Sequence, residues 1–354
     1  MAEMTPRERV LTAMNRQQPD KVPKTAGFTA AIRELFEEKT GSKNPGAYFK
    51  MEPSGAGFKP TEKKTDFRKF FKDLPENANI NEWGTAHVPG RVHHFTHRRF
   101  PMETFDSAAQ VDEYPWPDMK EPYRHEHLEE HVQRLHDNDA YVSGSVAHIF
   151  ETAWQVRGMD RLLMDFVMYP DIAASVLDHI TDLKAFVARR LAEADVDCLH
   201  CGDDVGMQDR MIMSPEMWRE WFKPRWAKVI AAGRAVKPDV QVFYHSDGYI
   251  EPIIPDLIEI GITILNPVQP ECMDPVKLKK EYGDRLAFWG TIGTQTTMPF
   301  GTPEDVRQTV KERIETVGKG GGLLLAPTHV LEPEVPWENI VAFFDAVEEF
   351  GRYD

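Results

Sequence analysis

Histidine and carboxylate side chains stand at the ends of several short apolar segments of this sequence. His245, Asp247 and His329 are the set best suited to a metal ion. Two imidazoles and one carboxylate are good ligands for zinc or another divalent cation, and three protein ligands leave coordination positions open for a substrate. The alternative is that each side chain is an ordinary polar residue at the end of a strand, with Asp247-Gly248 forming a turn.

A second set of residues is suited to proton transfer. Asp203 and Asp204 are adjacent carboxylates, an arrangement that can hold a proton near neutral pH or bind a cationic substrate. Neighbouring side chains of an extended chain point to opposite faces, so we expect one of the two to face the site and the other to cap a loop or helix. Glu151 and His148 form a further acid/base candidate, with a structural histidine as the alternative.

Polar side chains near the same strand ends are candidates for substrate binding: His148, Tyr244, Asn266 and Gln269. Cys198 and Cys201 have the spacing of a redox or zinc motif, but they fall inside a predicted strand. Residues three apart in a strand project to opposite faces. We therefore expect neither a disulfide nor a shared metal between these two cysteines.

The elements that would position these side chains are short apolar runs without polar alternation, which are typical of parallel strands covered by helices. The predicted strands are Val22–Phe28, Asn79–Trp83, Ala140–Ala147, Val196–Gly202, Val240–His245, Ile262–Asn266, Leu286–Gly290 and Gly322–Ala326. Helical stretches separate most of them. This alternation predicts an α/β fold, a (β/α)8 TIM barrel, in which reacting groups sit just past the carboxyl ends of the strands.

Helix starts are clearly marked along the chain. Thr5-Pro6-Arg7-Glu8 combines a capping hydroxyl, a proline at the first helical position and a glutamate at the third, and predicts a helix to about Arg16. Ser214 and Thr302 introduce similar starts, and Asp171–Ala194 carries a one-sided apolar stripe. The region from about residue 50 to 138 is less regular, and we expect it to be a loop-rich insertion over one end of a single-domain barrel.

The composition argues against several classes of protein. The formal net charge is −15, from 42 Lys and Arg and 57 Asp and Glu, whereas binding of nucleic acid requires a basic patch. No apolar run approaches the roughly 18 residues of a membrane span, and the first residues lack the apolar core of a signal peptide. Three cysteines are too few for a disulfide scaffold, so we expect a cytoplasmic protein.

A combination of motifs resembles the uroporphyrinogen decarboxylase superfamily. The motifs are Gly202-Asp203-Asp204-Val205-Gly206, Ser214-Pro215-Glu216-Met217-Trp218, Tyr244-His245-Ser246-Asp247-Gly248, Leu265-Asn266-Pro267-Val268-Gln269, and Ala326-Pro327-Thr328-His329 through Pro336-Trp337-Glu338-Asn339. The resemblance is strong over roughly residues 140 to 349 and weak over the N-terminal third. Within the superfamily the chain is most similar to the corrinoid-dependent methyltransferase branch, which includes anaerobic O-demethylases.

The resemblance to the porphyrinogen decarboxylases themselves is weaker at one important place. Those enzymes carry an Arg-Gln-Ala-Gly-Arg stretch after the first strand that holds substrate carboxylates, and here that place reads Thr25-Ala26-Gly27-Phe28-Thr29. Without these arginines a highly carboxylated tetrapyrrole lacks its electrostatic clamp, which argues against porphyrinogen decarboxylation. The histidine that those enzymes carry near the end of the last strand is present here as His329, so a reaction distantly related to porphyrinogen decarboxylation stays open.

The methyltransferase branch often holds zinc through a His-x-Cys pair after the fifth strand and a Cys after the eighth. This chain resembles it in position but has His245-Ser246-Asp247 and His329 there. These ligands are harder than thiolates, so the metal is zinc, another divalent ion or none. The chain has no Asp-x-His-x-x-Gly corrinoid signature, and the resemblance therefore implies that a separate corrinoid protein carries the cobalt.

The resemblance implies an enzyme that moves a methyl group from a small methylated donor, such as an aromatic methyl ether, to the cobalt of that corrinoid protein. The metal or His329 would polarise the ether oxygen, and Asp203, Asp204 or Glu151 would orient the donor or handle the proton. One alternative is a metal-independent decarboxylase or lyase of a small acid that uses His329 and Asp203; another is a non-catalytic ligand-binding barrel. The oligomeric state stays open, with a homodimer as one hypothesis.

Overall fold

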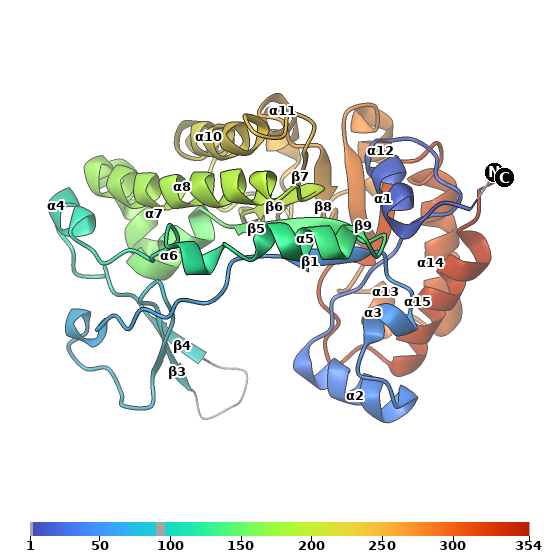
Figure 1. The fold of residues 1–354 in the computed structure, drawn as a ribbon, viewed down its shortest axis with the longest axis horizontal. Coiled ribbons are helices and arrows are strands. Elements are labelled where there is room, and N and C mark those ends of the chain that lie inside the picture. The colour runs from blue at the N-terminus through green and yellow to red at the C-terminus, as the bar shows by residue number, and fades with distance from the viewer. Residues whose placement is uncertain (1–2, 90–95, 354) are drawn as a thin grey trace.

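A barrel of parallel strands wrapped by helices forms the centre of the computed structural model, which describes residues 3–89 and 96–353 (Figure 1). Its sheet has seven strands in the order β1-β5-β6-β7-β8-β9-β10, and every neighbouring pair is parallel. The bounds are β1 (Pro53–Ala56), β5 (Tyr141–Ala147), β6 (Cys198–Gly202), β7 (Gln241–His245), β8 (Ile264–Asn266), β9 (Ala287–Ile292) and β10 (Leu323–Pro327).

The segment predicted as the first strand, 22–28, closes the barrel through isolated contacts rather than a continuous ladder. Lys24 forms a parallel bridge with Leu325 of β10, and on its other side the Lys24 carbonyl accepts a hydrogen bond from Glu52, next to β1, at 3.4 Å. Pro23 has no N–H to donate, which limits regular pairing here. The segment thus lies between β10 and β1 and completes the predicted TIM barrel.

The second predicted strand was wrong. Only Asn79–Ile80 (β2) is extended, and it belongs to a separate antiparallel sheet with β3 (Ala86–Pro89) and β4 (Thr96–Arg99). The barrel strand at this point of the chain is β1, whose sequence Pro-Ser-Gly-Ala contains none of the β-branched or aromatic residues that mark a strand. Backbone pairing with β5 makes it a strand, and backbone pairing leaves no pattern in the sequence.

Helices cover the outside of the barrel, with α8 and α10 running along one side of it in Figure 1. No helix in the described part of the chain is long and apolar enough to cross a bilayer. The α-helices are α1 (Pro6–Met14), α2 (Ala30–Thr40), α3 (Pro45–Tyr48), α4 (Ala108–Asp112), α5 (Leu128–His136), α6 (Phe150–Arg157), α7 (Met159–Met168), α8 (Pro170–Glu193), α9 (Pro215–Trp221), α10 (Lys223–Arg234), α11 (Ile254–Glu259), α12 (Pro275–Tyr282), α13 (Thr297–Phe300), α14 (Pro303–Thr316) and α15 (Trp337–Phe350).

The sequence signals for helix starts are confirmed. Thr5 and Glu8 form a capping box at α1, Ser214 accepts a hydrogen bond from the N–H of Met217 at α9, and Thr302 caps α14. In each case proline occupies one of the first helical positions, where its missing N–H has no partner to lose. These caps fix where several of the covering helices begin.

The irregular region, residues 50–138, holds short pieces of several kinds. It contains β1, the small antiparallel sheet, α4, α5 and the 3-10 turns Arg68–Phe70 and Pro122–Arg124. β3 and β4 lie well away from the parallel sheet (Figure 1), whereas β1 is a barrel strand. That the remainder acts as an insertion over the barrel within one domain stays a prediction.

The interior of the barrel is a small apolar cluster. Tyr141, Cys198, Phe243 and Leu324 project into it from the strands, and Met14 of α1 packs against them from one end. Cys201, in contrast, belongs to the larger cluster between the strands and the outer helices. The alternation of side chains in β6 therefore separates Cys198 from Cys201, and all three cysteines are free thiols.

A buried ion pair fastens the corner between α6 and α7, and it carries a prediction about stability. Arg157 Nε donates to Asp165 at 2.6 Å, and Arg157 Nη1 donates to the carbonyls of Met102 and Phe105. Replacing Asp165 with Ala would leave the guanidinium buried without its counter-ion, and we expect a loss of about 3–5 kcal/mol in the free energy of unfolding. Denaturant titration measures this, and Asp160→Ala, an exposed carboxylate on the same helix, is expected to cost under about 0.5 kcal/mol.

Candidate active site

A cavity of about 490 Å³ lies at the carboxyl ends of the barrel strands, where TIM-barrel enzymes carry their reacting groups. We call it the central cavity. Its walls come from the ends of β5 to β10 and from the segment that closes the barrel. The side chains with chemistry to offer are His148, His200, Phe243, His245, Asn266, Trp289, Thr328 and His329.

His245 is held in one orientation by Asn266. The amide nitrogen of Asn266 donates to the carbonyl of Trp289 at 2.7 Å, so its oxygen Oδ1 faces His245, whose Nδ1 lies 2.5 Å away. Because a carbonyl-type oxygen only accepts, Nδ1 must carry the proton in this contact. Without a proton on Nε2, the ring presents the lone pair of that nitrogen to the cavity, which is the arrangement seen in metal-binding histidines. Asn266 orients the imidazole and also lines the cavity, so its predicted role in substrate binding stays a prediction.

Two carboxylates face this lone pair. His245 Nε2 lies 3.5 Å from Asp204 Oδ1 and 4.0 Å from Asp247 Oδ1, and ligand atoms of the three residues lie within 4.8 Å of one another. Asp247 Oδ1 is buried and has no hydrogen-bond partner among the described residues. Burial raises the pKa of Asp247; His245 opposes this shift and the charge of Asp204 adds to it. Such a cluster is repulsive unless a cation or a proton lies within it.

The loops that carry these carboxylates are tied together. Asp204 Oδ1 accepts a hydrogen bond from the N–H of Asp247 at 2.9 Å, and Gln269 Oε1 accepts one from the N–H of Gly248 at 2.6 Å. Gln269, predicted to bind substrate, therefore positions the turn that carries Asp247. It also lines a smaller cavity of about 230 Å³ together with Asp247 and His329.

The predicted metal set is only partly reproduced by the geometry. His245 and Asp247 do come together, and Asp204, predicted as a proton-transfer residue, is the third member of their group. His329 lines both the central cavity and the smaller one, but it lies outside the group of ligand atoms within 4.8 Å of one another. His329 thus faces the cluster from the cavity wall, a position from which it could contact a bound molecule.

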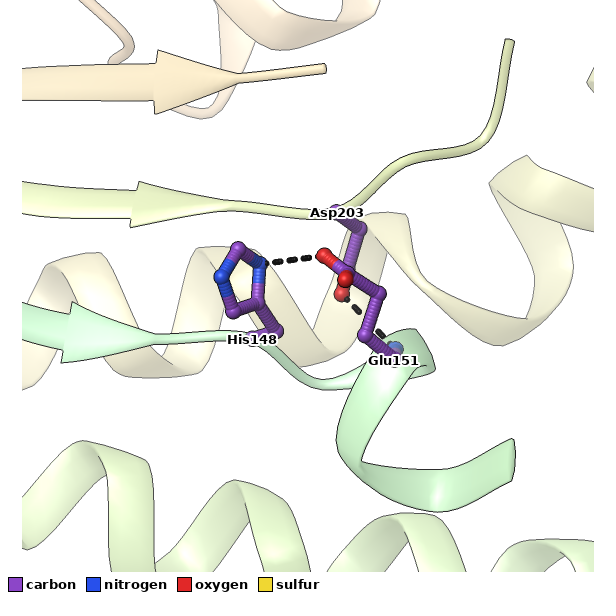
Figure 2. A group of neighbouring side chains, drawn as sticks. All are labelled: His148, Glu151 and Asp203. Carbon is purple, nitrogen blue, oxygen red and sulfur yellow. Dashed lines mark hydrogen bonds and ion pairs between the residues drawn. The ribbon is translucent and has the colours of Figure 1, made fainter. Parts of the chain in front are cut away.

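His148 and Glu151 form the predicted acid/base pair at the edge of the central cavity (Figure 2). His148 Nδ1 lies 2.6 Å from Glu151 Oε2 and 2.8 Å from the carbonyl of Gly202. Burial disfavours the charged imidazole, but the hydrogen bond and charge of Glu151, together with the charge of Asp203, outweigh it and raise the pKa of His148. The same pair lowers the pKa of Glu151 against the effect of its own burial. His148 lines the cavity, and its role in proton transfer stays a prediction.

Asp203 has a different environment from Asp204, although the two are adjacent. Asp203 is 0% exposed, and its Oδ1 accepts hydrogen bonds from the N–H groups of Ile149 and Glu151 at 2.9 and 3.2 Å, as Figure 2 shows for Glu151. Its Oδ2 accepts from the indole of Trp226 at 2.9 Å. Burial raises the pKa of Asp203 to about 7. Asp203 thus caps the start of α6, and Asp204 is the one of the pair that joins the cluster with His245 and Asp247.

Tyr244, predicted to contact substrate, is placed on the other side of its strand. Side chains alternate along β7, so Phe243 and His245 line the cavity and Tyr244 points outward, where it is fully buried against Trp226. The prediction overlooked this alternation. A tyrosine at this position packs helix α10 onto the barrel and does not reach a molecule in the cavity.

Sequence reasoning missed His200 and Trp289 as residues of the cavity. Both line it, and His200 packs edge-on against Phe243 with ring centres 3.6 Å apart. Burial, followed by the charges of His245 and His148, lowers the pKa of His200 to about 3, so this imidazole is neutral. The signal was available, because His200 lies two residues after the inward-facing Cys198 and must point the same way.

The loops that carry Asp204 and Asp247 are in close backbone contact at Gly206, so we expect this position to require glycine. A Cβ at this position would lie 2.4 Å from the Asp247 carbonyl and 2.7 Å from the Tyr249 nitrogen. Gly206→Ala must push the loops apart, and displacement of reacting groups by about 1 Å reduces rates roughly 100-fold. We expect a loss of that size in turnover; Gly55→Ala, with a single backbone contact at 4.0 Å, is the control and should retain activity.

The fold and the cavity together define the class of protein: a TIM barrel of the enzyme type, with histidines and carboxylates gathered at one mouth. The chain belongs to the uroporphyrinogen decarboxylase (URO-D) family, whose model matches residues 98–350. The match covers every strand of the parallel sheet except β1 and includes each residue of the cluster described above.

Curated relatives carry two kinds of name. The chain is 28% identical over 180 residues to the methylcobamide:CoM methyltransferase MtaA of Methanosarcina barkeri, an alignment that covers 51% of this chain and 50% of the relative. It is 27% identical over 177 residues to a uroporphyrinogen decarboxylase of Psychromonas ingrahamii, over 46% of this chain and 47% of that protein. The chain therefore matches about half the length of these relatives.

One solved structure is similar to this chain over nearly the whole length of both. A methyltransferase from Methanosarcina mazei superposes with a TM-score of 0.69 at 20% identity, covering 98% of this chain and 99% of that one. At this identity the similarity establishes the fold. The resemblance to the URO-D superfamily inferred from the sequence motifs, and to its corrinoid methyltransferase branch, is confirmed.

Proposed function

We propose that this protein transfers a methyl group from a small methylated donor, such as an aromatic methyl ether, to the cobalt of a separate corrinoid protein. The observation that carries the proposal is the cluster of His245, Asp204 and Asp247 at the mouth of an aromatic-lined cavity. The relationship to a methylcobamide:CoM methyltransferase supports a corrinoid as one reaction partner.

The cluster fits a divalent metal ion, zinc or a cation of harder preference. His245 Nε2, Asp204 and Asp247 would hold it, and the buried, unpartnered Oδ1 of Asp247 is the donor atom that such an ion would satisfy. When bound, the ion supplies a Lewis acid that polarises the ether oxygen and makes the phenolate a better leaving group. Asn266 keeps the donor nitrogen of His245 aimed at this point.

Proton transfer falls to His148 and Glu151. With Nδ1 bonded to Glu151, the protonated ring of His148 keeps a second proton on Nε2, and its raised pKa favours this charged form. That proton can neutralise the phenolate oxygen as it leaves. Glu151 holds the ring in place and stabilises its charge, so its own carboxylate stays ionised.

The walls of the central cavity favour a flat aromatic ring over a porphyrinogen with its many carboxylates. Phe243 and Trp289 offer aromatic surface, with ring centres 5.3 Å apart. Among the described residues that line the central cavity none is lysine or arginine, and the Thr25-Ala26-Gly27 segment lies at the place where the decarboxylases carry arginines. A substrate with many carboxylates would therefore find no cationic partner there.

Elemental analysis and a methyl-transfer assay test the proposal. The purified protein is expected to bind about one divalent ion per chain, and to convert 2-methoxyphenol and cob(I)alamin to catechol and methylcobalamin, followed by the change in the cobalamin spectrum. If the reconstituted protein binds no metal and transfers no methyl group, the metal-independent decarboxylase or lyase becomes the working hypothesis. That alternative would depend on His329, which lines the cavity, since both oxygens of Asp203 are already hydrogen-bonded.

A further inference from the structure

A second cavity, of about 540 Å³, lies beside the central one at the end of β5. Ser145 and Ala147 line both cavities, so the two share a wall of small side chains. The other walls come from the turn after β1, from the irregular region and from α8. The methyl transfer proposed above uses only the central cavity and leaves this side cavity without a role.

Most of the charged side chains that line the side cavity are cations, in a chain whose net charge is −15. Lys59, Arg124 and Lys184 line it, against a single carboxylate, Glu82. The Arg124 guanidinium is already paired, at 2.9 Å from Glu82 and 2.8 Å from Asp118. Lys59 is exposed to solvent. Lys184 is therefore the buried charge in this cavity that is available to a ligand.

Lys184 projects from α8 and is only 5% exposed. Within the described residues its ammonium forms no ion pair; its Nζ lies 5.0 Å from the centre of the Trp83 ring, a cation–π contact that offsets only part of the desolvation. Burial lowers the pKa of Lys184 to about 8, against the opposing charges of Asp203 and Glu82, so the amine is mostly protonated near neutral pH. A buried cation without a counter-ion destabilises a folded chain unless a ligand supplies the opposite charge.

We propose that Lys184 binds an anionic group, a carboxylate or a phosphate, carried at one end of the small methylated substrate. This inference rests on the proposed function, because the methyl-bearing ring would occupy the central cavity beside Phe243 and Trp289. The anionic end would pass the small side chains of Ser145 and Ala147 to reach the ammonium. The substrate class is then an aromatic methyl ether that carries a negative charge.

Calorimetric titration with a charged and a neutral probe of the same shape tests the proposal. We expect the protein to bind 3-methoxybenzoate at least about 10-fold more tightly than 3-methoxybenzamide, since a hydrogen bond between charged groups in a buried site is worth that much. Lys184→Met should abolish the preference, and Lys228→Met, an exposed lysine of α10, should keep it. Equal binding of the two probes, or a preference that survives Lys184→Met, would overturn the proposal.

Inorganic phosphate, titrated alone, distinguishes a substrate group from a free anion. Phosphate binding as tight as that of 3-methoxybenzoate, and lost in Lys184→Met, would overturn the assignment to the substrate and leave a free-anion site. The titrations need no turnover, so a Lys184-dependent preference without methyl transfer contradicts the proposed function alone. Transfer from the charged and the neutral ether at equal kcat/KM contradicts the role of Lys184 alone.

Thermal unfolding without ligand separates a binding role from a structural one. An unpaired buried cation destabilises the chain, so Lys184→Met is expected to melt at the same temperature as the parent protein or higher. A structural lysine would behave in the opposite way. A decrease in Tm of more than about 5 °C in Lys184→Met would contradict the proposal.

Discussion

Replacing His245 with Ala is expected to lower the bound divalent metal and the rate of methyl transfer by about 100-fold or more. The substitution removes the only imidazole of the cluster and with it the lone pair that faces Asp204 and Asp247. His245 lies at the end of β7 and is partly exposed, so the core keeps its packing. We therefore expect the Tm to change by only a few degrees.

Asn266→Ala provides a graded comparison for His245→Ala. It keeps the imidazole but removes the oxygen that orients it. Loss of a hydrogen bond that orients a metal ligand typically lowers metal affinity about 10- to 100-fold. His131→Ala, on α5 and outside the cavity, is the control and should bind metal like the parent protein. Metal content measured by elemental analysis, with transfer rates alongside, gives both quantities. Full metal content and full activity in His245→Ala would refute the proposed mechanism.

The barrel was predictable because most of its strands are apolar runs between marked helices. β5 to β10 fall on predicted strands, and the helix caps at Thr5, Ser214 and Thr302 are where the sequence placed them. β1 was not predictable, because Pro53–Ala56 carries no strand-forming side chain and is extended only through its pairing with β5. Long-range backbone pairing of this kind leaves no trace in a local pattern.

The sequence was enough to predict which loops carry the site residues, but not which of their side chains contact one another. The strand-end rule indicated the loops that carry Asp204, His245, Asp247 and His329, and all four line cavities or the cluster at the barrel mouth. The alternation of side chains indicated that only one of two adjacent aspartates would face inward. Whether Asp204 or His329 stands nearest to His245 depends on how two loops pack, since Asp204 accepts from the backbone of Asp247. Such a contact between loops has no signature in residue spacing.

Asp203 and Asp204 are expected to separate stability from activity when each is replaced by Ala. Asp203→Ala removes the acceptor of three hydrogen bonds in a fully buried place, and leaves the N–H groups of Ile149 and Glu151 and the indole of Trp226 without partners. Each unsatisfied donor costs about 1–3 kcal/mol. We expect a total loss of about 3–5 kcal/mol in the free energy of unfolding, measured by denaturant titration.

Asp204→Ala should show the opposite pattern. Its side chain is partly exposed and contributes one hydrogen bond, to the backbone of Asp247, so we expect a loss in stability of about 1 kcal/mol or less. Removal of a carboxylate from the cluster should still lower the bound metal and the transfer rate by about 100-fold. If Asp204→Ala keeps its metal while His329→Ala loses it, the third ligand is His329 and the cluster must rearrange on binding. Because the two aspartates are adjacent and chemically identical, a difference of this kind can come only from the faces of the chain to which they project.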